Sequence, residues 1–191
     1  QGQGLCRHLN RPRVSGRAFA ALPWRRLLPH DGIPGARNGA PRGADKAIGR
    51  ERGRTAANIA SLLVTLPGTP AAYVESFNQL FANLALAHRE RPLKTFVFTS
   101  PLPGEGKTLS AINFALIGAS RGVRVLLIDA DLRCGVVGTV LGCGQTPGFA
   151  ELLAGTARAG DVLREVSLGE YGSLVAIPSG ALAARIGYAG Y

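Results

Sequence analysis

A glycine-rich stretch with a lysine and a threonine is the part of the sequence best suited to chemistry. Residues 100–116 read SPLPGEGKTLSAINFAL, and Gly104–Thr108 matches the end of the phosphate-binding pattern G-x-x-x-x-G-K-[ST], with Pro101 in place of the first glycine. Backbone N–H groups of such a loop surround a phosphate, the Lys107 ammonium reaches the β- and γ-phosphate oxygens, and the Thr108 hydroxyl binds Mg²⁺. The alternative is a chance match. The predicted nucleotide-binding residues are Pro103, Gly104, Glu105, Gly106, Lys107, Thr108 and Leu109.

Two aspartates after a second apolar segment are the next candidates. In LLIDADLR (126–133), Asp129 lies 22 residues after Lys107. A right-handed crossover makes the strands before the loop and before Asp129 parallel, so both sites are expected at one edge of the sheet. We expect Asp129 to bind Mg²⁺ with Thr108, and Asp131 to hold a metal-bound water or accept a proton from an attacking hydroxyl. Lys107, Asp129 and Asp131 are thus the predicted catalytic residues. The alternative is that the aspartates only cap the next element.

The elements that must position these residues alternate between helical and strand patterns. The run 123–130 is almost continuously apolar, as in a strand buried on both faces, and Gly122 is predicted to end the helix before it. The predicted elements are helices over 71–88, 107–120, 148–153 and 159–166, and strands over 94–100, 123–130 and 173–180. This alternation predicts an α/β fold with a parallel sheet. Because three strands make a small sheet for this class, we expect the domain to be incomplete at the C-terminus.

The positive charge lies mainly at the start of the chain. The net charge is +10, and residues 1–55 hold 12 of the 22 Lys and Arg but only three of the 12 Asp and Glu. This Gly, Pro and Arg-rich part has no sustained period, which predicts disorder. Its arginines can attract anionic lipid or nucleic acid, and the alternatives are a solvated linker or sequence outside the native frame. We therefore expect a tail over 1–64, with order beginning near residue 71 inside a nucleotide-binding domain over 65–191.

Compartment signals favour the cytoplasm. No apolar run reaches the roughly 18–20 residues of a spanning helix, and the first residues lack a signal peptide. The three cysteines, an odd number without a C-x-x-C pair, fit reduced thiols better than a disulfide frame or a zinc site. The three histidines have no ligand spacing. These patterns predict a cytoplasmic protein without a structural metal.

The two motifs together resemble one family. TSPLPGEGKT followed by VRVLLIDADLR is similar to the bacterial tyrosine kinases of capsule and exopolysaccharide synthesis, the BY-kinases, whose loop S-x-x-x-G-E-G-K-[ST] also lacks the first glycine. The resemblance covers about residues 65–182. It implies a P-loop NTPase fold that uses ATP and Mg²⁺ to phosphorylate its own or a neighbouring subunit's tyrosines. It also implies a membrane polysaccharide co-polymerase subunit as partner, a place at the inner face of the plasma membrane, and no nucleic acid.

Several positions depart from the family pattern. The third motif, an apolar strand ending in D-x-x-P, is expected after residue 180, so activity of this chain is in doubt. Of the family's terminal tyrosine cluster only Tyr188 and Tyr191 are present, and a frayed end is the alternative account of both. The assembly motif E-x-x-R-x-x-R reads Glu75, Asn78 and Phe81, without its arginines, which leaves a homo-oligomer in doubt. The arginine-proline after D-x-D-L-R reads Cys134-Gly135.

Two other functions stay open at this point. Partitioning or division-site ATPases of the ParA/MinD type share D-x-D but carry a lysine early in the loop, where this chain has Leu102. The second is a truncated, non-catalytic module that binds nucleotide or nothing and acts as a partner of polysaccharide machinery. Fold analogy alone does not decide between activity and its loss.

Overall fold

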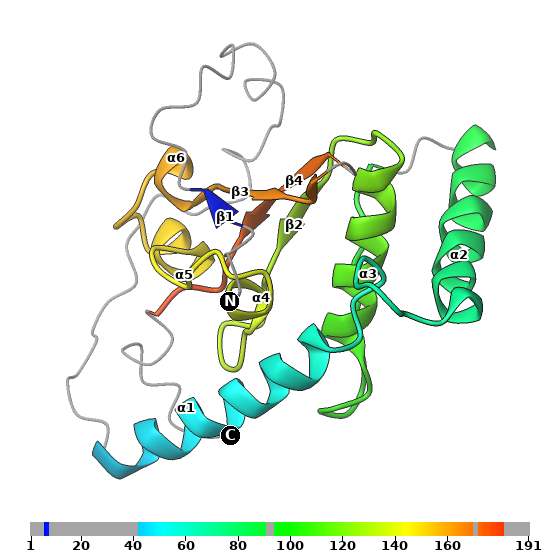
Figure 1. Ribbon diagram of the computed structural model, residues 1–191. Helices are drawn as coiled ribbons and strands as arrows, with labels where there is room; N and C mark the ends of the chain where they lie inside the picture. The colour runs from blue at the N-terminus through cyan, green and yellow to red at the C-terminus, as the bar shows by residue number, and fades with distance from the viewer. Residues whose placement is uncertain (1–5, 8–41, 91–93, 170–171, 182–191) are drawn as a thin grey trace.

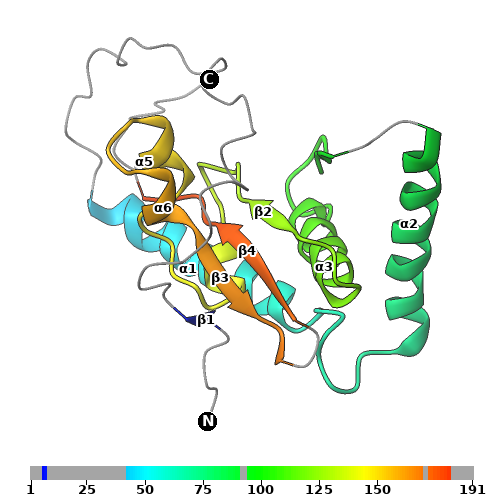
Figure 2. The same cartoon turned by 90° about the horizontal axis from the view of Figure 1, so that it is seen from above.

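A computed structural model of the 191-residue chain describes residues 6–7, 42–90, 94–169 and 172–181. Figure 1 shows a small sheet with helices around it. The helices are α1 (Arg42–Ala60), α2 (Ala71–Glu90), α3 (Lys107–Ser120), α4 (Val137–Val140), α5 (Phe149–Leu153) and α6 (Ala159–Val162). The strands are β1 (Cys6–Arg7), β2 (Leu126–Ile128), β3 (Arg164–Ser167) and β4 (Ser173–Ile177). Seen from above in Figure 2, α3 lies between the sheet and α2.

The sheet is mixed, so the predicted parallel sheet is confirmed only for one pair of strands. The order is β1-β3-β4-β2, and β2 pairs parallel with β4, with Leu127 opposite Ala176. β3 pairs antiparallel with both β1 and β4. The helix predicted over 159–166 is wrong in its second half, because α6 ends at Val162 and the chain turns into β3. Alternate residues of β3 are buried, as expected for a strand with one face toward the core. Its pairing with β4 therefore favours a strand here over the predicted helix.

The segment 94–100 is not a strand, which overturns the strand predicted there. Its aromatic residues pack on α3 instead: the rings of Phe96 and Phe98 lie 5.4 and 5.5 Å from that of Phe114, centroid to centroid. Val97, between them, is 84% exposed. The β-branched and aromatic residues of this segment therefore meet aromatic rings on one side and solvent on the other, without a hydrogen-bonded neighbour strand.

The predicted burial of β2 on both faces is also wrong. Leu127 packs against the core that α3 helps to form, while Leu126 and Ile128 on the opposite face are 38% and 42% exposed. β2 is shorter than the predicted strand over 123–130 and lies at one end of the described strand order. Among the described residues, this face of β2 therefore has no helix that covers it as α3 covers the other.

Three of the predicted helices are confirmed. α2 and α3 match the helices predicted over 71–88 and 107–120, and α5 matches the short helix predicted over 148–153. Gly122 follows the end of α3 with φ of 77°, and its N–H donates to the carbonyl of Ala119. A left-handed residue of this kind commonly ends helices, and glycine adopts it without steric cost. The strand predicted over 173–180 is confirmed as β4, which ends earlier.

Order begins before residue 71. Residues 42–60 form α1, so the predicted disorder is wrong for this stretch. Ala56 of α1, together with Leu63 and Val64 in the turn that follows, is buried in the main core. Residues 1–5 and 8–41 of the predicted tail, and the terminal Tyr188 and Tyr191, fall outside the described residues. Among the described helices, none is both long and apolar enough to cross a lipid bilayer.

One polar side chain joins three elements in the core. Asn113, fully buried in α3, accepts a hydrogen bond from Val64 N–H at 3.0 Å and donates to the carbonyl of Leu62 and the hydroxyl of Tyr73, both at 3.0 Å. These bonds fix the connection between α1 and α2 to the middle of α3. A buried amide that satisfies backbone groups in this way adds specificity as well as stability.

We expect Asn113→Ala to lower the free energy of unfolding by about 3 kcal/mol, because it leaves the Val64 N–H and Leu62 C=O groups without their partner. Urea denaturation followed by circular dichroism measures the change. Asn83→Ala is the matched control, since Asn83 lies exposed on α2, and it should change stability by less than about 0.5 kcal/mol. Equal effects of the two substitutions would contradict the role of Asn113.

Candidate functional site

The glycine loop leads directly into the first turn of α3. Gly104 and Gly106 have φ of 83° and 91°, a backbone conformation that residues with a Cβ rarely adopt. Gly106 is the N-cap residue, and α3 begins at Lys107 without a side-chain cap. The N-terminal amides of a 14-residue helix therefore face the loop with the partial positive charge of the helix dipole. This arrangement suits an anion, as the motif predicted.

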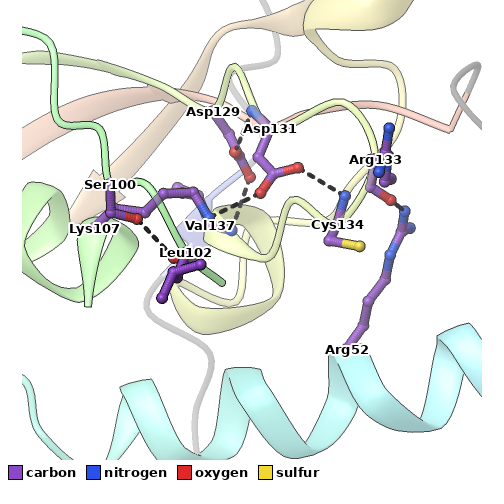
Figure 3. A network of polar contacts seen from close by, with 9 residues as sticks. All are labelled: Arg52, Ser100, Leu102, Lys107, Asp129, Asp131, Arg133, Cys134 and Val137. Carbon is purple, nitrogen blue, oxygen red and sulfur yellow. Dashed lines mark hydrogen bonds and ion pairs between the residues drawn. The ribbon is translucent and has the colours of Figure 1, made fainter. Parts of the chain in front are cut away.

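Two side chains of the loop bind the backbone of Leu102, the residue between its two prolines. The N–H of Leu102 donates to the Glu105 carboxylate at 3.2 Å. The Ser100 hydroxyl donates to the carbonyl of Leu102 at 3.0 Å (Figure 3). Both polar groups of this backbone position are thus satisfied inside the loop. The loop is therefore held in shape by hydrogen bonds among its own residues.

Asp129 is a buried carboxylate at the end of β2. Its N–H donates to the carbonyl of Ile177 at 2.9 Å, and the residue is among the buried charged ones, 5% exposed. Its two oxygens accept hydrogen bonds from the N–H groups of Val137, at 3.0 Å, and of Asp131, at 3.2 Å (Figure 3). Burial raises the pKa of the Asp129 carboxyl, and these two hydrogen bonds oppose the rise without cancelling it. The carboxylate is therefore oriented by the main chain.

Asp131 pairs with the loop lysine. Lys107 Nζ lies 3.1 Å from Asp131 Oδ2, and Oδ1 accepts a hydrogen bond from the N–H of Cys134 at 2.8 Å. The Asp131 side chain is 26% exposed. Partial burial alone would raise its pKa, but the hydrogen bond from Cys134 and the Lys107 ammonium outweigh it, so the pKa lies below its ordinary value. The structure thus brings together two of the three predicted catalytic residues, and Asp129 lies beside them (Figure 3).

Gly135 closes the site on the side of β4. A Cβ at this position would lie 2.3 Å from Ser179 Oγ and 2.6 Å from Asp129 Oδ2, distances that real structures do not show. Ser179 is itself buried. The glycine lets the chain pass close enough for the Val137 N–H to reach Asp129. The departure from the family pattern at position 135 therefore has a packing reason in this chain.

The predicted metal ligands have suitable chemistry. Asp129 and Thr108 offer a carboxylate and a hydroxyl oxygen, and Thr108 is the second residue of α3, half-buried. Mg²⁺ favours one or two such oxygens together with water and phosphate oxygens. No group of three or more His, Cys, Asp or Glu side chains with metal-binding geometry exists within the described ranges. An ion here would depend on the nucleotide for further ligands, and the assignment of Thr108 and Asp129 stays a prediction.

The seven predicted nucleotide-binding residues form one continuous stretch. Pro103, Gly104 and Glu105 are exposed in the loop, and Gly106 to Leu109 are half-buried at the start of α3. Reasoning from the sequence missed Gly135, Ser179 and the amide of Val137. Small residues after a D-x-D motif are a weak signal for Gly135. The backbone amide of Val137 carries no signal in the sequence, because every residue other than proline has one.

We expect Gly135→Ala to destabilise the protein by about 1–3 kcal/mol, because the added methyl group must displace Ser179 or the Asp129 carboxylate. Thermal or urea denaturation measures the effect. Gly160→Ala is the control, since a Cβ on Gly160 in α6 meets nothing within 4 Å, and it should be neutral or stabilising. If Gly135→Ala is tolerated as well as Gly160→Ala, the close packing around Asp129 is not a constraint.

Comparison with known proteins gives relatives that are named tyrosine-protein kinases. No protein-family model matches the chain. It is 39% identical over 79 residues to Tyrosine-protein kinase YwqD of Bacillus subtilis, covering 41% of this chain and 33% of that protein. It is 36% identical over 107 residues to Tyrosine-protein kinase CpsD of Streptococcus agalactiae, covering 56% and 44%. It is 38% identical over 90 residues to Putative tyrosine-protein kinase EpsB of Ralstonia nicotianae, covering 47% and 12%.

The chain thus spans less than half the length of these curated relatives. The identity of 36–39% extends over roughly half of its own residues. The resemblance seen in the loop and the D-x-D motif is confirmed, since all three relatives are named tyrosine-protein kinases. Over this stretch the chain is related to the bacterial tyrosine-protein kinases.

Proposed function

We propose that the chain is a P-loop nucleotide-binding domain that transfers the γ-phosphoryl group of Mg²⁺-ATP to tyrosine, in the synthesis and export of capsule or exopolysaccharide. The observation that carries the proposal is the meeting of Lys107 and Asp131 at the uncapped N-terminus of α3. The similarity to named tyrosine-protein kinases supports tyrosine as the acceptor. The mixed α/β sheet is compatible with this class of domain.

Each predicted site residue has a role that its position supports. The amides from Gly104 to Thr108 bind phosphate oxygens, and the Lys107 ammonium binds the β- and γ-phosphates. Thr108 and Asp129 hold Mg²⁺, which neutralises charge on the phosphates when bound. Asp131 accepts the proton of the attacking tyrosine hydroxyl. Positioning of these groups and their electrostatics supply most of the lowering of the barrier.

The Lys107–Asp131 ion pair implies that nucleotide binding comes before Asp131 acts as a base. The ammonium lies 3.1 Å from Asp131, so it must leave this carboxylate to reach the phosphates. The phosphates carry more negative charge than one carboxylate, which favours the exchange. Once Lys107 has turned away, the influence that lowers the pKa of Asp131 is weaker, and Asp131 becomes a better proton acceptor. Nucleotide binding thereby prepares the base.

We propose that the acceptor tyrosines belong to this protein or to a neighbouring copy, and that a membrane co-polymerase subunit holds the domain at the cytoplasmic face. The partitioning ATPase is less suited to this chain, because Leu102 takes the place of the lysine that those enzymes carry early in the loop. The non-catalytic module is distinguished by experiment: it forms no phosphotyrosine, whether or not it binds nucleotide.

We expect Lys107→Met to weaken Mg²⁺-ATP binding by about tenfold to a hundredfold, the value of one or two hydrogen bonds to a charged group. Calorimetric titration of the full chain measures the affinity. Lys94→Met is the matched control, because Lys94 is an exposed lysine before the loop, and it should bind ATP as the unchanged protein does. Equal affinity in both variants would show that the phosphate loop is assigned wrongly.

We expect Asp131→Asn to separate binding from transfer. The substitution removes the ion pair that competes with the phosphates, so ATP affinity should be unchanged or higher. Phosphotyrosine formation should fall by about a hundredfold or more, because the proton acceptor is removed. Single-turnover assays with labelled ATP, read beside the calorimetry, test this. A variant that transfers phosphate at the unchanged rate would rule out Asp131 as the base.

A further inference from the structure

Helix α1 reaches the site from outside residues 65–182, the stretch that resembles the tyrosine kinases. A guanidinium nitrogen of Arg52, Nη2, donates a hydrogen bond to the backbone carbonyl of Arg133, which is 81 residues away in the sequence. Figure 3 shows the Arg52 side chain rising from α1 to the turn that follows Asp131. Arg52 is half-buried, whereas its neighbours Arg50 and Arg54 are exposed.

The hydrogen bond falls on a particular peptide group. The carbonyl of Arg133 and the N–H of Cys134 belong to the same planar peptide unit, in which they point in opposite directions. Arg52 holds the carbonyl, and the N–H donates to Asp131 Oδ1 at 2.8 Å. The other oxygen of Asp131 lies 3.1 Å from Lys107 Nζ. One continuous chain of polar contacts therefore runs from α1 through a single peptide group to Asp131 and on to the phosphate loop (Figure 3).

The charge of Arg52 strengthens this chain. A cation at the carbonyl end polarises the peptide group, which makes its N–H a better donor at the other end. That N–H is the backbone donor that holds Asp131 Oδ1. Arginine suits the position because it stays charged and donates from a rigid planar group.

The rest of α1 is anchored to the element that carries Lys107. Ala56, one turn after Arg52, is buried in the main core, and the chain that follows α1 is fixed to α3 by Asn113. α1 also packs against α4 (Figure 1), whose first residue Val137 holds Asp129. Arg52 is thus presented from a helix fastened on both sides of the site.

We propose that Arg52 is a positioning residue of this site: it orients the Arg133–Cys134 peptide so that the Cys134 N–H holds the Asp131 carboxylate toward Lys107. The role in catalysis rests on the proposed function, whereas the hold on the peptide does not require nucleotide. α1 is, on this proposal, a functional part of the domain and not a linker before it.

The test compares Arg52→Ala with Arg54→Ala, an exposed arginine of the same helix, in the full chain without added nucleotide. Nuclear magnetic resonance reads the proton shift of the Cys134 amide and its rate of exchange with solvent. Arg52→Ala removes the hydrogen bond to the Arg133 carbonyl and so releases the peptide that directs the Cys134 N–H to Asp131. We expect an upfield shift of this amide proton and about tenfold faster exchange, the value of the weakened hydrogen bond from the amide to the charged carboxylate. Arg54→Ala should leave both unchanged. Unchanged values in Arg52→Ala would overturn the proposal.

Arg52→Lys keeps the charge but not the planar donor, so it should give an intermediate exchange rate. It also decides the question if Arg52→Ala does not fold, because a lysine variant with the unchanged shift and rate would contradict a need for the guanidinium. Asp131→Asn supplies the second half of a double-mutant cycle. Adding Arg52→Ala to it should change Cys134 exchange by less than about twofold, since the acceptor is already weakened. Full additivity would mean that Arg52 acts elsewhere.

Phosphotyrosine formation gives an independent readout. Arg52→Ala should lower kcat about tenfold with little change in the KM for ATP, because the residue acts on the base and not on the phosphates. A change confined to KM would contradict this. If the unchanged protein forms no phosphotyrosine, the proposed function fails, but the amide measurements still decide whether Arg52 holds the peptide.

Discussion

The structure around the site depends on the hydrogen bonds that the buried carboxylate of Asp129 requires. A charged group that is almost withdrawn from water is tolerated only when hydrogen bonds replace its hydration. Here both hydrogen bonds come from backbone amides, that of Asp131 in the turn after β2 and that of Val137 at the start of α4. The N–H of Asp129 itself donates to Ile177 and so extends the pairing of β2 with β4. Sheet, turn and short helix meet at this residue, and Gly135 is small because they meet so closely.

The second constraint is that α3 serves the site and the core at once. Lys107 stands in its first turn and Asn113 in the middle, with a row of buried apolar residues along the same helix. Asn113 fixes the turn after α1, and that turn is continuous with the helix that carries Arg52. Shifts of α3 within the core would therefore move the loop lysine and the turn of Asp131 relative to each other. Stability and site geometry are linked through one helix.

Sequence reasoning worked where the signal is local. Helical spacing over 71–88, the glycine loop and the helix from Lys107 depend on neighbouring residues, and the structure has them as expected. It failed for 94–100 and for β3, because a strand needs a partner that no local pattern specifies. It also failed for α1, whose sequence is polar and rich in arginine, since Ala56 and the following turn become ordered only by packing on distant residues. Lys107 and the two aspartates were predicted from side-chain types. Gly135, Val137 and Arg52 were not, because their roles depend on contacts between main-chain atoms and distant groups.

The Arg133–Cys134 peptide decides which substitutions the turn after Asp131 tolerates. Both of its bonds use main-chain atoms, so neither depends on the side chain at position 133 or 134. The bond from Arg52 accepts any residue at position 133, and the bond to Asp131 accepts any residue other than proline at position 134. A substitution of Cys134 that keeps the backbone amide therefore leaves both bonds in place. The geometry of this turn depends on Arg52 and Asp131, and not on the side chain at position 134.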